Sequence, residues 1–235
     1  MTGTAEDSLE PLEALGSVAI VAPHPDDESL GCGGLIARLA AVGRPPLVVV
    51  VSDGTGSHPN SRSFPAERLR ALREEETRAA VAALGLPFPP QFLRLRDTAV
   101  PHPGNPDFAE AVGRVASALP PEGVDTIAVS FRDDPHCDHQ AAFALATAVI
   151  ARIIRPVRLL EYVIWNDEAA TATPPGFRPW RLDITGVLDA KLRAISCHRS
   201  QTSDLISDDP DGFRLKPAML RRFERHWETY LEAIP

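Results

Sequence analysis

The sequence has few cysteines, no long apolar run and a deficit of positive charge. Its three cysteines, Cys32, Cys137 and Cys197, stand far apart, and so sparse and odd a set argues against a disulfide scaffold and for a reducing, cytoplasmic location. No apolar run approaches the ~20 residues needed to cross a bilayer, and the small, acidic N-terminus has none of the features of a signal peptide. The net charge of −8 disfavours a general nucleic-acid-binding protein, which needs a basic face.

What is present is the composition of an ordinary globular protein. Hydrophobic residues make up 44% and charged residues 24% of a 235-residue chain, which fits one sizeable domain. We expect residues 1–16 to form a flexible N-terminal leader and residues 17–235 to form a single domain.

Predicted strands alternate with predicted helices along the chain. The strands are expected at 17–22, 47–51, 91–95, 125–131, 157–165 and 181–184, and the helices at 27–42, 65–84, 107–118, 136–154, 186–197 and 217–232. The unbroken run Leu47-Val48-Val49-Val50-Val51 is typical of a parallel strand that is buried on both faces. The pattern predicts an α/β fold with a mostly parallel sheet and helices on both faces.

A cluster of polar residues follows the first predicted strand. It reads His24-Pro25-Asp26-Asp27-Glu28, and the prolines on either side of His24 stiffen the turn. A second cluster, Asp133-Asp134-Pro135-His136-Cys137-Asp138-His139, follows the strand at 125–131. Ligands of open α/β sheets bind beyond the carboxyl ends of the strands, so we expect both clusters at one edge of the sheet.

Together the two clusters offer the ligands of a catalytic metal site. Such a zinc site keeps three protein ligands and one open position, which His24, His139 and one of the two aspartates, Asp26 or Asp27, would supply. The spacing alone does not say which aspartate binds and which acts as base. His136 is placed to stabilise an oxyanion or to protonate a leaving amine. We expect Asp138 to hold the tautomer of His136.

These motifs resemble those of the zinc-dependent LmbE-like (PIG-L) deacetylases. The resemblance implies a Rossmann-like fold, zinc ligands at His24, Asp27 and His139, Asp26 as the base, and His136 as the residue that assists the tetrahedral intermediate. Iron(II) also suits a ligand set of two histidines and a carboxylate.

Two further segments extend the resemblance. Arg73-Glu74-Glu75-Glu76 with Leu84-Gly85 matches a family helix whose arginine faces substrate, and Lys191 with His198-Arg199-Ser200-Gln201 matches a C-terminal family segment. One departure concerns the substrate, because Thr55 in Ser52-Asp53-Gly54-Thr55-Gly56 stands where the family often has a glutamate. The sequence leaves open whether Asp53 compensates. The candidate substrate contacts are Arg73, Asp53 and Thr55.

The function expected from these residues is hydrolysis of an N-acetyl or other N-acyl group from an amino-sugar conjugate by metal-activated water. The alternative is a metal- or sugar-binding module of the same fold without turnover. Gly31-Cys32-Gly33-Gly34 lacks the spacing of a nucleotide-binding loop, so we expect it to serve close packing of a helix on the sheet. The expected partner is a small-molecule amino-sugar conjugate, with no nucleic acid, no membrane span and the possibility of a homo-oligomer.

Overall fold

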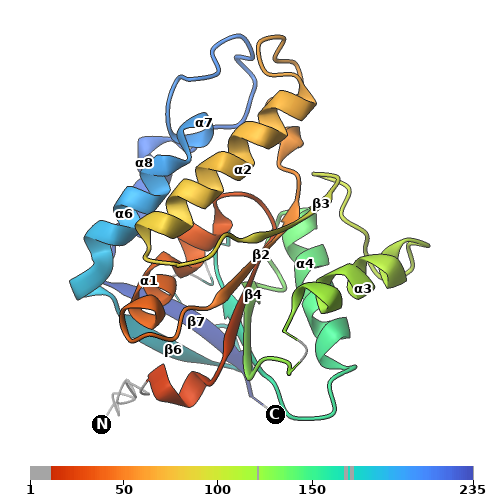
Figure 1. Ribbon diagram of the computed structural model, residues 1–235, viewed down its shortest axis with the longest axis vertical. Helices are drawn as coiled ribbons and strands as arrows, with labels where there is room; N and C mark the ends of the chain where they lie inside the picture. Colours follow the sequence, from red (N-terminus) through yellow and green to blue (C-terminus); the bar gives the residue numbers. More distant parts are fainter. Residues whose placement is uncertain (1–11, 121, 167–168, 170–171, 235) are drawn as a thin grey trace.

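The computed structural model describes residues 12–120, 122–166, 169 and 172–234. Within these ranges the chain forms a seven-stranded sheet with the strand order β3-β2-β1-β4-β5-β7-β6 (Figure 1). The strands are β1 (Val18–Ala22), β2 (Leu47–Ser52), β3 (Gln91–Leu95), β4 (Thr126–Ser130), β5 (Arg158–Tyr162), β6 (Phe177–Asp183) and β7 (Trp227–Ala233).

The direction of the strands places a crevice at the centre of the sheet. Strands β3, β2, β1, β4 and β5 are parallel, whereas β7 runs antiparallel to both β5 and β6. From β1 the chain moves outward through β2 and β3, and then returns to the other side of β1 to form β4. Such a reversal of strand order opens a crevice at the carboxyl ends of the two central strands, here β1 and β4.

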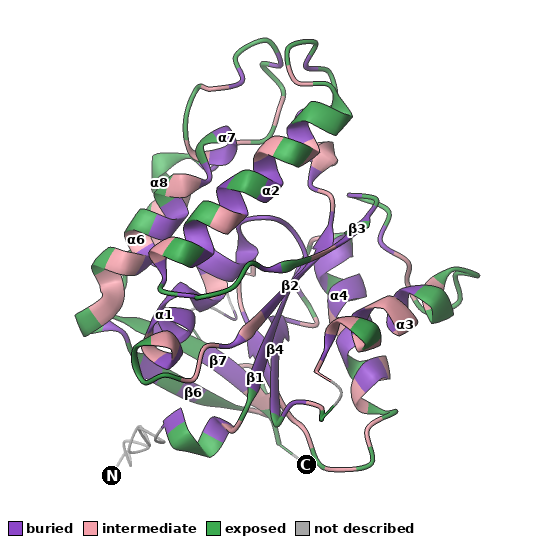
Figure 2. Ribbon diagram, viewed as in Figure 1, coloured by how far each residue is buried: buried purple, intermediate pink, exposed green. Residues whose placement is uncertain are grey.

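Helices cover both faces of the sheet, as the sequence predicted. They are α1 (Asp27–Ala41), α2 (Ala66–Ala83), α3 (Phe108–Ala118), α4 (Cys137–Ile150), α6 (Leu188–Cys197), α7 (Arg199–Thr202) and α8 (Pro217–Leu220). Strand β1 is buried throughout (Figure 2). Its side chains alternate between two cores, Ile20 facing the side of α1, α2 and α6 and Val21 facing the side of α3 and α4.

The prediction of a helix over 217–232 is wrong. The chain forms the short helix α8 and a 3₁₀ turn over Arg221–Phe223, and then enters β7. Glu228 points into the protein from β7, where its carboxylate accepts hydrogen bonds from the backbone N–H groups of Gly34 and Leu35, from Lys191 Nζ and from Tyr230 Oη. A buried, fully paired glutamate looks like a solvated helix residue in a sequence, which hid the two-residue period of the strand.

The N-terminal region and α1 pack closely on the rest of the fold. Residues 1–11 lie outside the described residues, but Leu12–Leu15 form a 3₁₀ helix with both leucines buried, so this part of the expected leader belongs to the core. A Cβ added to Gly31 would lie 2.3 Å from the ring of Tyr162, which confirms the close helix packing expected of the glycine-rich stretch. None of the described helices combines the length and the apolar character that crossing a membrane requires.

Candidate active site

The two polar motifs meet at the central crevice. His24, Asp26 and Asp27 follow β1 and begin α1, and His136, Asp138 and His139 begin α4 after β4. A cavity of about 170 Å³ opens above them. It is lined by His24, Asp26, Asp27, Gly56, Ser57, Arg73, Asp97, Thr98, His136, Trp165, Gln201 and Phe213.

Three of the predicted ligand atoms form a nearly equilateral triangle. Asp27 Oδ2 lies 3.2 Å from both His24 Nδ1 and His139 Nε2, and these two nitrogens are 3.3 Å apart. Tetrahedral donors that each lie about 2.0–2.2 Å from a zinc ion are separated by about 3.3–3.6 Å. The described residues therefore fit a divalent metal ion, with His24, Asp27 and His139 as the ligands.

Buried carboxylates lie close to the outer nitrogens of both histidines. His24 Nε2 lies 3.2 Å from Asp138 Oδ2 and 3.3 Å from Asp97 Oδ1, and His139 Nδ1 lies 3.3 Å from Asp134 Oδ2. A proton on His24 Nε2 leaves the lone pair of Nδ1 directed into the triangle. This is how carboxylates behind a metal site orient histidine ligands and fix their tautomer.

The electrostatics of the cluster favour a cation. Burial lowers the pKa of His24, but contacts with Asp138, Asp27 and Asp97 outweigh it and place that pKa well above the ordinary value. Burial likewise opposes charge on His139, yet Asp27 and Asp134 raise its pKa to about 9. The carboxylates thus stabilise positive charge between the two imidazoles, which is the place of the proposed ion.

Asp26 stands beside the triangle in an unusual backbone conformation. Its φ of 134° is in a region that residues other than glycine rarely adopt. Arg73 donates to the Pro25 carbonyl at 2.6 Å and to Asp26 Oδ2 at 3.2 Å. Burial and the charge of Asp27 raise the pKa of Asp26 to about 7, although Arg73 lowers it. A carboxyl group with a pKa near neutrality suits a general base.

Glu28 and His198 support Asp26 from behind. The Asp26 N–H donates to Glu28 Oε2 at 3.0 Å, and Glu28 Oε1 lies 2.9 Å from His198 Nε2. Glu28 and His198 are both buried. The C-terminal segment around His198 is thereby connected to the backbone of the proposed base.

His136 is oriented as a hydrogen-bond donor toward the cavity. Its Nδ1 accepts the backbone N–H of Asp138 at 3.2 Å, so in the neutral ring the proton resides on Nε2. Burial, followed by the neighbouring His24 and His139, lowers the pKa of His136. A neutral imidazole with a free Nε2–H can donate to an oxygen that gains negative charge.

The structure corrects the expected role of Asp138. Its carboxylate contacts His24, and it also accepts the N–H groups of Thr98 and Val100. The tautomer of His136 is held by the backbone N–H of Asp138, not by the side chain. The order of the strands causes this, because β1 lies beside β4 and brings His24 next to Asp138.

The three predicted substrate contacts have different surroundings. Arg73 lines the cavity and holds Asp26. Asp53 Oδ1 instead accepts hydrogen bonds from the Thr55 N–H and Oγ1 and from the Asp97 N–H. Gly56 and Ser57, which follow Thr55, line the cavity. Direct contact of Asp53 or Thr55 with substrate stays a prediction.

Sequence reasoning missed Asp97 and Phe213. Asp97 follows β3 in a loop without a motif, and only the pairing of β3 beside β2 brings it to the site. Asp134, whose role the sequence left ambiguous, is fully buried and accepts the N–H groups of His136 and Trp165. The position of Asp97 at the carboxyl end of a predicted strand was the one available clue.

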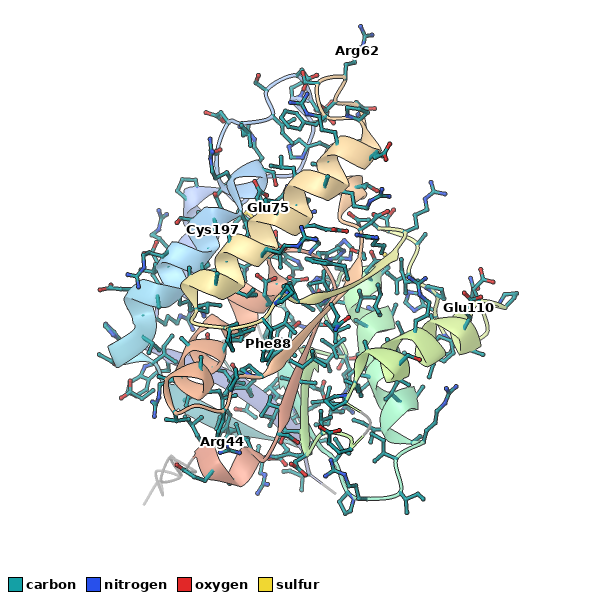
Figure 3. The ribbon with its side chains drawn as sticks, in the orientation of Figure 1. Arg44, Arg62, Glu75, Phe88, Glu110 and Cys197 are labelled. Carbon is teal, nitrogen blue, oxygen red and sulfur yellow. The ribbon has the colours of Figure 1, made fainter. Side chains whose placement is uncertain are left out.

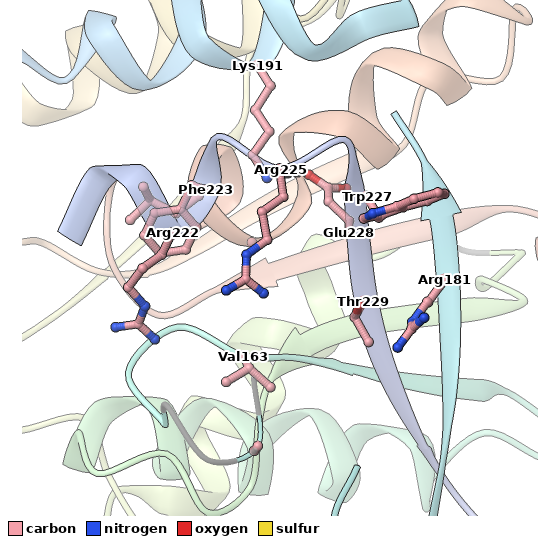
Figure 4. Close-up of a pocket in the computed structure, with 12 residues that line it drawn as sticks. Val163, Arg181, Lys191, Arg222, Phe223, Arg225, Trp227, Glu228 and Thr229 are labelled. Carbon is pink, nitrogen blue, oxygen red and sulfur yellow. Dashed lines mark hydrogen bonds and ion pairs between the residues drawn. The ribbon is translucent and has the colours of Figure 1, made fainter. Parts of the chain in front are cut away.

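A second cavity, of about 390 Å³, opens beside β7 (Figure 4). Lys191, Arg222, Phe223, Arg225, Trp227 and Glu228 are among the residues that line it. Lys191 Nζ lies 2.7 Å from Glu228 Oε1, and both side chains are buried. The predicted ligands, base and imidazole donor line the first cavity or lie beneath it.

The fold and the site together define a class: an α/β protein with two histidines and one aspartate arranged for a divalent metal ion, and with a carboxylate and an imidazole beside it. A family model described as PIG-L, GlcNAc-PI de-N-acetylase, matches residues 19–150. The chain belongs to this family.

Three known proteins illustrate the similarity. The chain is 30% identical over 236 residues to the 1D-myo-inositol 2-acetamido-2-deoxy-alpha-D-glucopyranoside deacetylase of Actinosynnema mirum, covering 82% of this chain and 83% of the relative. It is 27% identical to a probable N-acetyl-alpha-D-glucosaminyl L-malate deacetylase 2 of Bacillus cereus, covering 90% and 98%. The N,N'-diacetylchitobiose deacetylase structure from Pyrococcus horikoshii superposes with a TM-score of 0.73 at 23% identity, covering 97% and 88%.

Proposed function

We propose that this protein is a metal-dependent N-deacetylase that removes an N-acetyl or other N-acyl group from a small-molecule amino-sugar conjugate. The observation that carries the proposal is the triangle of His24, Asp27 and His139, with Asp26 and His136 on its open side. The relatives that are named as deacetylases of amino-sugar compounds support the same reaction.

When bound, a divalent ion lowers the pKa of a coordinated water and polarises the amide carbonyl. We propose zinc as this ion, and iron(II) fits the same ligands. The residues of the chain supply the movement of protons. Asp26 takes the proton of the attacking water, because it lines the cavity while Arg73 donates to its Oδ2.

His136 acts on the other side of the scissile amide. Its Nε2–H donates to the acyl oxygen as that oxygen gains negative charge. The protonated Asp26 then returns its proton to the leaving nitrogen, which departs as the amine. One carboxyl group thus serves as base and then as acid, which a pKa near neutrality allows.

The alternative is a metal- or sugar-binding module without turnover. Such a module needs neither a buried carboxylate with a raised pKa nor an imidazole oriented as a donor, and this site has both.

We also propose a reducing, cytoplasmic location, which the free thiols of Cys32, Cys137 and Cys197 support. Self-association into a homo-oligomer stays a prediction.

The test is amine release from N-acetylglucosamine conjugates by protein that has been stripped with a chelator and reloaded with zinc or iron(II). We expect activity only in the reloaded samples. Asp26→Ala should abolish turnover and retain the metal, whereas Asp27→Ala should lose the metal. Full activity after metal removal would exclude the mechanism, and the opposite metal contents of the two variants would reverse the roles of the aspartates. Metal-loaded protein without turnover on any conjugate would favour the binding module.

A further inference from the structure

The cavity above the proposed metal site has an aromatic wall. Trp165 follows β5, and Phe213 lies in the loop between α7 and α8. Both line the cavity, and their rings pack edge to face with their centroids 5.8 Å apart. The reacting groups Asp26, Asp27 and His136 line the same cavity. The two aromatic rings and the reacting groups therefore line one and the same cavity.

Trp165 is fixed relative to the metal ligands. Its backbone N–H donates to Asp134 Oδ2 at 3.0 Å, and the same oxygen lies 3.3 Å from His139 Nδ1. One buried carboxylate therefore sets the positions of a proposed ligand and of the aromatic wall. Trp165 therefore belongs to the structure of the site and is not an unconstrained surface residue.

Phe213 is fixed by the loop on the other side of the cavity. Its N–H donates to the Ser57 carbonyl at 2.7 Å. Asp208, in the loop of Phe213, accepts hydrogen bonds from the N–H groups of Arg62 and Ser63. The two loops lie side by side beyond the N-terminal end of α2 (Figure 1). Phe213 nevertheless remains 42% exposed, which leaves apolar surface that a ligand can cover.

Gln201 supplies a polar contact below this wall. Its Nε2 donates to Ser57 Oγ and Ser200 Oγ, while among the described residues its buried Oε1 has no hydrogen-bond partner. Buried carbonyl oxygens are nearly always paired. Since Gln201 lines the cavity, a donor from the ligand, such as a sugar hydroxyl, would satisfy it.

The cavity is large enough for only part of an amino-sugar conjugate. About 170 Å³ is well below the ~300–1,000 Å³ of pockets that enclose drug-sized molecules. A space of this size suits one N-acylated sugar ring beside Gln201. A group attached to the sugar would then extend past Phe213, whose side chain is partly exposed.

We propose that Trp165 and Phe213 form a subsite for an apolar, planar aglycone, so that the preferred substrates are N-acylated amino sugars joined to an aryl or similarly flat apolar group. This inference rests on the proposed deacetylase function and specifies its substrate class. An aromatic ring that packs against two others gains about 0.5–1.5 kcal/mol beyond its buried area. That corresponds to a preference of about two- to twelvefold over an aglycone that cannot pack there.

The experiment compares the phenyl and the methyl β-glycosides of N-acetylglucosamine by amine release from the zinc-loaded enzyme. We expect a kcat/KM ratio of phenyl to methyl of about two to twelve. Phe213→Ala should lower this ratio toward one. The matched control is Phe88→Ala, because Phe88 is 39% exposed in the loop between α2 and β3 (Figure 3) and lies outside the cavity. This control should leave the ratio unchanged.

A binding measurement separates the failure of this inference from the failure of the proposed function. Calorimetric titration with the phenyl and methyl glucosaminides, which lack the acyl group, gives the same comparison without turnover. A ratio of dissociation constants near one would overturn the aglycone subsite even if both glycosides are deacetylated. A clear preference for the phenyl compound that Phe213→Ala removes would support the subsite even if neither is deacetylated, and the deacetylase proposal would fail alone. An equal fall in the ratio for Phe88→Ala would also overturn the subsite.

Discussion

Asp26 combines a strained backbone, a buried carboxylate and two opposing charges. Burial and the charge of Asp27 raise its pKa, and Arg73, at 3.2 Å, lowers it. The sequence predicted that one of two adjacent aspartates acts as a base, but their different surroundings come from α2, which carries Arg73 to the site. The electrostatic distinction between the aspartates is therefore a property of the tertiary structure.

The pH dependence of the reaction should follow Asp26. Because the base must be deprotonated, kcat/KM should fall as the pH drops through the pKa of Asp26, which burial raises to about 7 in the metal-free site and which a bound divalent ion would lower. Arg73→Gln removes the charge that lowers this pKa, so the acidic limb of the profile should move to higher pH. Arg73→Lys keeps the charge and serves as the control. A limb that is unchanged or moves to lower pH in Arg73→Gln would show that another group controls the profile.

The residues that touch the proposed metal were predictable, and their supports were not. His24, Asp27 and His139 stand in two compact motifs. Asp97 reaches His24 because β3 pairs with β2 and β2 pairs with β1, and the carboxylate of Asp138 reaches it because β4 pairs with β1. These contacts depend on the order of the strands, which a single sequence does not display.

Helix α1 is held at two points by buried ion pairs of similar kind. Near its beginning, Glu28 pairs with His198 and accepts the N–H of Asp26. In its middle, Glu228 pairs with Lys191 and accepts the N–H groups of Gly34 and Leu35. Only the first pair touches the backbone of the proposed base, so the two can be compared directly.

Glu28→Ala should lower kcat by up to about 10²-fold, because a small displacement of a catalytic group has effects of that size. Bound metal and KM should stay near the wild-type values. Glu28→Gln retains an acceptor for the Asp26 N–H and should recover part of the activity.

Glu228→Ala is the control for Glu28→Ala. It leaves a buried cation in the same way, so the melting temperature should fall, while kcat below the unfolding transition should remain unchanged. If both variants lose kcat equally, Glu28 is a structural residue of α1 and does not position Asp26.

The elements of the sheet were predicted to different degrees. Strands β1, β2 and β4 follow apolar runs, which the hydrophobic effect makes visible in sequence, whereas β3 and β5 mix apolar with polar and charged residues. Strand β7 was missed because its inward residue Glu228 is charged, and its burial depends on donors from α1 and α6. The alternation of inward and outward residues in such a strand can be recognised only when the donors that pair with its buried charge are known.

The molecule as a whole should depend on its metal for stability. Without an ion, the buried carboxylates and imidazoles of the cluster have no metal to bind, and the folded state lacks the free energy of metal binding. A ligand present at 1,000 times its Kd stabilises the folded state by about 4 kcal/mol, which for a chain of this size is about 8–16 °C in melting temperature. Calorimetry of chelated and zinc-reloaded protein measures this shift. Equal melting temperatures would argue against a bound ion, and Asp27→Ala, which should not respond to zinc, is the control.

The position of the cavity residues along the chain has a consequence for how this enzyme could diversify. The matched segment 19–150 contains His24, Asp27 and His139 with Asp26 and His136. Trp165, Gln201 and Phe213 come from the remaining third of the chain. The reacting groups and the proposed aglycone subsite therefore come from separate stretches of the chain, whereas Gly56, Ser57 and Arg73, which also line the cavity, come from the first. Substitutions confined to the second stretch are expected to change the preferred aglycone while the reaction stays the same.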